Sequence, residues 1–170
     1  MKNGLKVIIA VAAVILVIVG IVAGSYNSLV TAQTAVETKQ ADIQTQLQRR
    51  ADLIPNFVST VKGYTKYEQE TLTAVTEARA KVGSANSAQS LSEADEELDK
   101  AISVWVNAVT EAYPDLKANS NYIALQDELA GTENRIAVAR KDYNEVVQSY
   151  NAMIKKFPKN IIAGMFGFEK

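Results

Sequence analysis

Two adjacent arginines, Arg49 and Arg50, lie close to an aspartate and a proline in the segment QRRADLIPNFVSTVKGY, residues 48–64. Guanidinium groups bind carboxylates and phosphates, so Arg49, Arg50 and Asp52 are candidate partner-binding residues. The alternative is that the segment forms a corner, where one helix ends and the next begins. A proline is tolerated in the first turn of a helix, where its missing N–H has no partner anyway. Asp52 would then cap a helix that contains Pro55, and the arginines would pair with carboxylates at the distal end of the domain.

The side-chain inventory excludes much of the chemistry that enzymes use. The chain has 170 residues with no cysteine and no histidine, which removes thiolate nucleophiles, imidazole bases and the usual zinc ligands. Its 18 basic and 19 acidic residues give a net charge of -1, so no overall charge attracts nucleic acid. We therefore expect no enzymatic activity, no catalytic residue, no cofactor, no metal site and no nucleic-acid partner.

Charged residues further along the chain have structural explanations. An acidic cluster lacks the glycine and the alternating ligands of a calcium loop, and it falls at a predicted helix start, where acidic side chains stabilise the helix dipole. Three charges beside the last predicted helix stripe are expected to form surface pairs or clips between helices. The acidic cluster is Glu93, Asp95, Glu96, Glu97 and Asp99, and the three charges are Glu133, Arg135 and Arg140.

An unbroken apolar run, VIIAVAAVILVIVGIVA, begins at Val7. With its flanking residues it reaches about 20 residues, the length that crosses a bilayer. Small residues at 23–25 leave a cleavable signal peptide as the alternative, but the run is longer than the apolar core of such peptides. Because Lys2 and Lys6 precede the run, the positive-inside rule predicts a cytoplasmic N-terminus and places the rest of the chain outside the cytoplasm.

Four segments after the run repeat apolar residues at spacings of three and four, which predicts amphipathic helices. The first covers residues 26–50 and the second follows Pro55. The third begins near Ser90, which has capping-box spacing to Glu93, and ends before Pro114. The fourth forms a seam of the coiled-coil type about 54 Å long. The stripes are Leu29, Val36, Ile43 and Leu47; Phe57, Val58, Val61, Tyr64, Leu72, Val75 and Val82; Leu98, Ile102, Trp105, Val109 and Ala112; and Tyr122, Leu125, Leu129, Thr132, Ile136, Ala139, Tyr143, Val146, Tyr150, Met153 and Phe157.

These patterns predict an all-α fold, because no segment alternates with strand period for long. We expect an N-terminal transmembrane helix that continues into an antiparallel up-down bundle of three to four long helices, since short connections favour antiparallel neighbours. The expected organisation is a cytoplasmic stub and membrane anchor at residues 1–24, a helical bundle at 25–157 and an apolar tail at 158–170.

The segment KKFPKNIIAGMFGF, residues 155–168, mixes lysines with apolar side chains, as segments that lie in a membrane interface do. An even number of long antiparallel helices returns the chain towards the bilayer, so we expect interface contacts here. The alternative is that the apolar residues cover the base of the bundle. The candidate membrane-interface residues are Lys155, Lys156, Phe157, Lys159, Phe166 and Phe168.

Six motifs, in order along the chain, make this sequence similar to the LemA family. They are YNSLV at residues 26–30, RRADLIPNFVSTVKGY at 49–64, VTEARAK at 75–81, EAYPDLKAN at 111–119, ELAGTENRIAVARKDYNEVVQSYN at 128–151 and FPKNIIAGMFGF at 157–168. The resemblance implies a single-span protein of the bacterial envelope with an α-helical bundle, in a family without an established enzymatic activity.

Two functional hypotheses agree with these observations. The first is a membrane-anchored extracytoplasmic scaffold or interaction protein, whose partners are the bilayer, through the N-terminal helix, and an unidentified envelope protein. The second is an extracytoplasmic sensory or ligand-binding bundle that signals through its span to a partner. A second copy of the chain, giving a homo-oligomer, is a further candidate partner. Both hypotheses predict a single-pass protein of the cell membrane.

Overall fold

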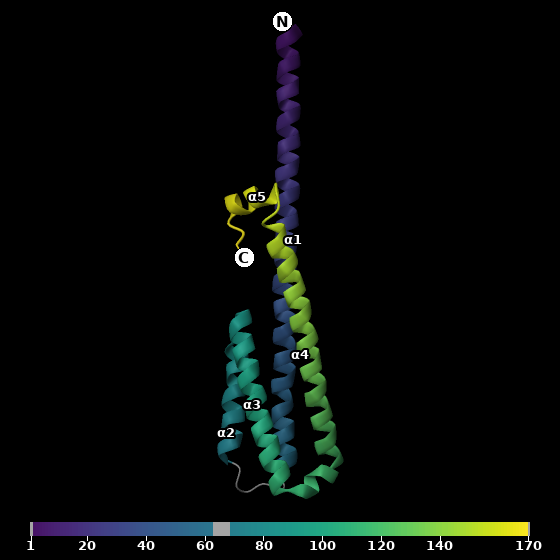
Figure 1. The fold of residues 1–170 in the computed structure, drawn as a ribbon, viewed down its shortest axis with the longest axis vertical. Coiled ribbons are helices and arrows are strands. Elements are labelled where there is room, and N and C mark those ends of the chain that lie inside the picture. The colour runs from purple at the N-terminus through teal and green to yellow at the C-terminus, as the bar shows by residue number, and fades with distance from the viewer. Residues whose placement is uncertain (1, 63–68, 170) are drawn as a thin grey trace. The chain divides into compact units, whose positions relative to one another are not determined.

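The computed structural model describes residues 2–62 and 69–169, and every regular element within these ranges is helical (Figure 1). The all-α prediction is therefore confirmed for this part of the chain. The helices are α1 (Lys2–Lys62), α2 (Gln69–Ser84), α3 (Ala88–Ala112), the short 3-10 helix η1 (Pro114–Ala118), α4 (Ser120–Met153) and α5 (Lys159–Phe166).

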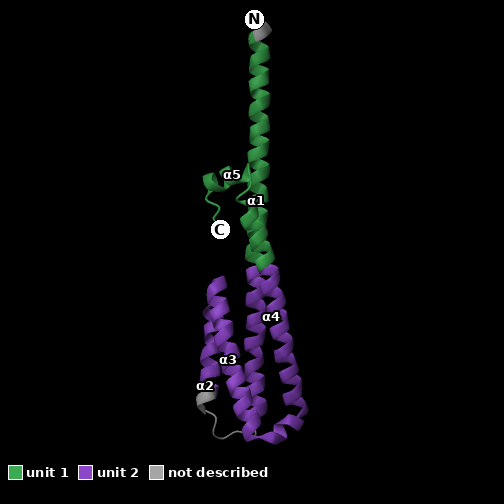
Figure 2. Cartoon of the chain, viewed as in Figure 1, with its two compact units in different colours: residues 1–38, 144–170 green, residues 39–143 purple. Residues whose placement is uncertain are grey.

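The chain divides into two compact units (Figure 2). Unit 1 contains residues 1–38 and 144–170, which are the first part of α1, the last part of α4, and α5. Unit 2 contains residues 39–143, with the rest of α1, all of α2, α3 and η1, and the first part of α4.

Unit 2 has one hydrophobic core, to which every helix of the unit contributes. The Phe57 ring of α1 lies 5.1 Å from the Trp105 ring of α3 and 5.1 Å from the Tyr122 ring of α4. The predicted stripes supply most of this core, although Ala112 is exposed and Tyr64 lies outside the described residues. Helical periodicity alone thus predicts which faces of these helices are buried.

The predicted corner at Pro55 is wrong. Helix α1 continues through Pro55 to Lys62, and Asp52 is an interior residue of that helix, not its cap. Proline inside a helix removes one backbone hydrogen bond and costs about 3 kcal/mol. The flanking residues Ile54 and Phe57 are at most 4% exposed, and burying two such side chains contributes about 3 to 6 kcal/mol, which offsets the local penalty.

The start of α3 also differs from the prediction. Ser87, not Ser90, is the N-cap residue: its hydroxyl accepts a hydrogen bond from the Ser90 N–H, and the Ser90 hydroxyl accepts one from the Ser87 N–H. The reciprocal pair satisfies two donors that the first turn leaves free. The capping box therefore exists three residues earlier than expected, with serine in place of Glu93.

Ten of the eleven predicted seam residues lie in α4 and are buried or half-buried, which confirms the prediction for these ten. The exception is Phe157: α4 ends at Met153, and the Phe157 side chain is 79% exposed. The seam pattern continued past the end of the helix because an apolar residue happened to fall on its spacing.

Unit 1 has its own small core, made by α1, the end of α4 and α5. Leu29 of α1 and Tyr150 of α4 are buried together with Ile162 and Ala163 of α5. The sequence patterns did not predict α5 as a helix. It ends at Gly167, whose φ of 74° is in the left-handed region that glycine adopts without steric cost.

Candidate functional site

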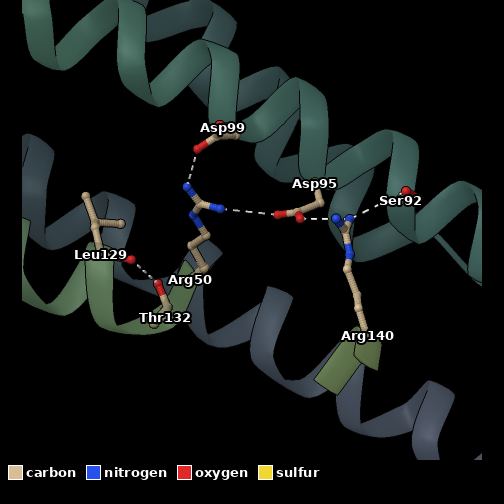
Figure 3. Close-up of polar contacts among 7 residues, drawn as sticks. All are labelled: Arg50, Ser92, Asp95, Asp99, Leu129, Thr132 and Arg140. Atoms are coloured by element: carbon tan, nitrogen blue, oxygen red, sulfur yellow. Dashed lines mark hydrogen bonds and ion pairs between the residues drawn. The ribbon is translucent and has the colours of Figure 1, made fainter. Parts of the chain in front are cut away.

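A partly buried ionic cluster connects three helices of unit 2 (Figure 3). The Arg50 guanidinium of α1 lies 3.3 Å from the Asp95 carboxylate and 2.5 Å from the Asp99 carboxylate, both on α3. The other Asp95 oxygen lies 2.9 Å from the Arg140 guanidinium of α4. Arg140 also donates a hydrogen bond of 3.5 Å to the Ser92 hydroxyl. Asp95 is thus held between cations from two different helices.

Burial controls the electrostatics of this cluster. The side chains of Arg50 and Asp95 are 5% and 9% exposed, whereas that of Asp99 is 49% exposed. Burial raises the pKa of the Asp95 carboxyl because it penalises the charged form, and the Arg140 and Arg50 guanidiniums act in the opposite direction. The opposite charges in the cluster compensate one another, so removing one of them would leave a buried charge without its partner.

The other two candidate partner-binding residues lie on the surface. The Arg49 guanidinium lies 2.9 Å from a Glu128 oxygen, and Arg135 reaches the same oxygen at 3.2 Å. The hydrogen bond from Arg135 lowers the pKa of Glu128, with Arg49 adding to the effect. Asp52 accepts a hydrogen bond from Gln48 within α1 and lies 3.6 Å from the Arg79 guanidinium of α2.

The structure therefore separates the two arginines that the sequence placed together. Arg50 is 4% exposed and faces the protein interior, while the Arg49 and Asp52 side chains are 56% and 58% exposed. Arg49 and Asp52 also line an open depression of about 720 Å³ that is formed by α1 alone. Of the three candidates, these two are the ones that a partner can reach directly.

Asp95 is the cluster member whose role the sequence patterns missed. The sequence pattern places it in the acidic start of a helix, but it lies on the buried side of α3 and its carboxylate is engaged by guanidiniums. One signal was present in the sequence. Asp95 stands four residues after Leu91 and three before Leu98, both buried, so it interrupts the apolar stripe. A charge on a buried stripe requires a partner.

A second candidate site is the contact between α5 and α1 in unit 1. The Lys159 ammonium donates a hydrogen bond of 2.7 Å to the Ser28 hydroxyl. The Tyr26 ring lies 4.9 Å from Phe166 and 5.7 Å from Phe168. Among the candidate membrane-interface residues, Lys159, Phe166 and Phe168 therefore pack against α1.

The remaining interface candidates are exposed. Phe157, Lys155 and Lys156 project from the segment that joins α4 to α5. Neither lysine forms an ion pair within the described part of the chain. Residues 155–168 therefore combine a packed side with an accessible apolar and basic side.

The same unit carries the apolar run. Within α1, an 18-residue window has a mean hydropathy of 3.2, and none of that window is buried. By length and composition, this one helix among the described residues can cross a membrane. Large apolar side chains from Leu5 to Ile21 are 49% to 71% exposed.

Comparison with known proteins identifies the family. Residues 39–170 match the model of the LemA family. The chain belongs to the LemA family. The membership that its motifs predicted is therefore confirmed, and the match covers unit 2 and the second segment of unit 1.

Three relatives of this LemA-family chain show how far the likeness extends. Protein LemA of Metamycoplasma hominis is 29% identical over 82% of this chain and 64% of the relative. Magnetosome protein MamQ 2 of Paramagnetospirillum magneticum is 25% identical, and magnetosome protein MamQ of Magnetospirillum gryphiswaldense is 22% identical. Both MamQ matches cover 85% of this chain and 62% of the relative. The chain thus spans less than two thirds of the length of these relatives.

Proposed function

We propose that this LemA-family chain is a single-pass membrane protein of the bacterial envelope that presents a helical domain to protein partners. The observation that carries the proposal is the exposure of the apolar run. A core helix of a soluble domain buries such side chains, whereas the window in α1 buries none. About 20 exposed apolar residues are stable inside a lipid bilayer, where no water surrounds them.

Continuity of α1 supports a retained anchor over a cleaved signal peptide. The helix runs without a break from the apolar run into the rest of unit 1. Ser25, at the end of the small-residue stretch, is only 7% exposed.

The domain beyond the anchor has the features of an interaction module. We infer that α1, α2, α3 and α4 of unit 2 run as an antiparallel bundle, because α2 and α3 are joined by Ala85–Ser87 alone and all four share one core. Arg49 and Asp52 are the charged residues through which we expect a partner to recognise the outer face of α1. The similarity to relatives named as magnetosome proteins supports the proposed role at a bacterial membrane.

Orientation is tested by cysteine labelling, since the natural chain has no cysteine. Lys117→Cys places a thiol at an exposed position of η1, and Asn3→Cys places one before the apolar run. We expect a membrane-impermeant maleimide to label the Lys117→Cys variant in intact cells, or in spheroplasts where an outer membrane is present. The Asn3→Cys variant should react only after lysis. The reverse pattern would refute the proposed topology.

The interaction role has a separate test. Proximity labelling from a fusion inserted after Lys117, in the native envelope, should give a reproducible set of neighbours. The Arg49→Ala/Asp52→Ala variant should lose the direct partner from that set, while the matched surface variant Lys100→Ala/Glu111→Ala retains it. If both variants give the same set as the natural chain, the outer face of α1 is not the docking surface.

A further inference from the structure

Helix α5 has one packed side and one unpartnered apolar side. Ile162 and Ala163 are buried at 5% and 4% exposure in the core of unit 1. The neighbouring side chains Ile161 and Met165 are 52% and 70% exposed. A helix that only covered a protein core would place polar residues on its outer side. The composition of α5 indicates that an apolar environment lies on that outer side as well.

The position of α5 on α1 identifies this environment. Phe166 and the end of the apolar run line an open hollow of about 350 Å³, to which α1 contributes Ile18, Val19 and Val22. The hollow is lined almost entirely by carbon and lies where the exposed apolar side chains of α1 give way to packed ones. Whatever solvates the apolar run therefore also reaches α5.

The charged and aromatic residues next to α5 are of the types found at a membrane surface. Lys155 and Lys156 precede α5 and are exposed. Tyr26 on α1 lies against Phe166 and Phe168. Tyrosine is enriched where a membrane meets water, and lysines near such a boundary bind anionic headgroups.

We propose that α5 is a second membrane contact, lying in the boundary between headgroups and acyl chains of the same bilayer that α1 crosses. Ile161 and Met165 enter the acyl region, Lys155 and Lys156 bind lipid phosphates, and a lipid acyl chain occupies the hollow beneath Phe166. This inference rests on the proposed membrane anchor. It adds that the contact of α5 with the bilayer fixes the orientation of unit 1 relative to the membrane surface. With this second contact, α1 no longer rotates freely about its own axis.

Spin labels on the full chain, reconstituted in vesicles that contain phosphatidylglycerol, test the inference. Single cysteines are introduced by Ile161→Cys or Met165→Cys and labelled with a nitroxide. Val14→Cys, in the apolar run, is the lipid reference, and Val104→Cys on α3 is the aqueous reference. Val14 and Val104 have the same natural exposure of 59%, which makes them matched controls.

Membrane contact predicts that labels at 161 and 165 collide with oxygen more than with a water-soluble nickel chelate, as the label at 14 does. Lys155→Gln/Lys156→Gln should lower the equilibrium constant between membrane-bound and free α5 by about fivefold per lysine in anionic vesicles. The same variant should change it little in uncharged phosphatidylcholine. The matched variant Lys100→Gln/Lys117→Gln, in unit 2, should have no effect.

Three results would overturn the inference, each for a different reason. An aqueous pattern at 161 and 165 with a lipid pattern at 14 leaves the anchor intact and removes α5 from the membrane. Spin–spin broadening between copies labelled at 165 assigns the apolar side of α5 to a second copy of the chain. An aqueous pattern at 14 contradicts the proposed anchor itself.

Discussion

Replacing Arg50 with methionine tests whether the ionic cluster stabilises unit 2. Methionine keeps most of the side-chain volume and removes the charge. Asp95 would then be left with the Arg140 guanidinium alone, in a site where its side chain is 9% exposed. Removing one partner of a buried ion pair costs roughly 3 to 5 kcal/mol. Because Arg140 stays in place and the Asp99 side chain is half exposed, we expect the lower end, about 3 kcal/mol.

The chain contains its own reporter for this measurement. Trp105 is its single tryptophan, is 3% exposed and packs on Phe57 in the core of unit 2. Urea unfolding of the full chain in detergent micelles is followed by the fluorescence of Trp105. For an unfolding slope of about 1 to 3 kcal/mol per molar urea, a loss of about 3 kcal/mol lowers the midpoint by about 1 to 3 M.

Arg49→Met is the matched control, because it removes the same group from the neighbouring position. The Arg49 side chain is 56% exposed and its partner Glu128 is 36% exposed, so the midpoint should change little. The double variant Arg50→Met/Asp95→Leu removes the unpaired buried charge as well and should recover part of the loss. Equal midpoints for Arg50→Met and Arg49→Met would refute the assignment of stability to the cluster.

Two further predictions concern α1 and α3. Pro55→Ala should raise the free energy of unfolding by about 2 kcal/mol, because alanine restores the hydrogen bond to Ala51 inside α1; a helix beginning at Pro55 would instead leave the urea midpoint unchanged or lower. Asp95→Asn should alter the pH dependence of stability. Since the folded-state pKa of Asp95 is raised above its ordinary 3.8, its contribution falls as the pH rises from 3.8 through the folded pKa. The urea midpoint of the natural chain minus that of the variant should therefore fall across that range; parallel curves would contradict the assignment.

The helical elements were predictable because their evidence is local. Leu98, Ile102, Trp105 and Val109 recur at spacings of three and four, and all four are buried in unit 2. The pattern needs no knowledge of the partner surface, since any helix with such a stripe must bury it. The same reasoning located the seam of α4.

Pro55 shows where local evidence fails. Its effect on the backbone is unfavourable in isolation, but the residues around it are buried against α3 and α4, and their packing decides the outcome. The local penalty is visible in the sequence, whereas the tertiary gain depends on contacts that only the fold makes. The helix therefore continues past a residue that usually ends one.

The ionic cluster was out of reach for a different reason. Arg50 and Asp95 are 45 residues apart, and each alone has an ordinary surface explanation. Only the fold brings them together. The apolar stripe of α3 carried a hint in Asp95, but the identity of the cation depended on the alignment of α1 with α3.

That alignment is what we infer the cluster controls. Leu47, Arg50 and Ile54 follow one another along the buried stripe of α1. Sliding α1 by one helical turn moves Arg50 by about 5.4 Å and brings a leucine or an isoleucine opposite Asp95. The apolar contacts of such a shifted packing resemble the native ones, because one aliphatic side chain replaces another. The buried Asp95 carboxylate would lose a partner, however, and that cost falls only on the shifted arrangement. Hydrophobic burial alone would give these registers similar free energies, and the charges favour one of them. Arg50→Met/Asp95→Leu should therefore give a domain that is stable but less uniquely packed.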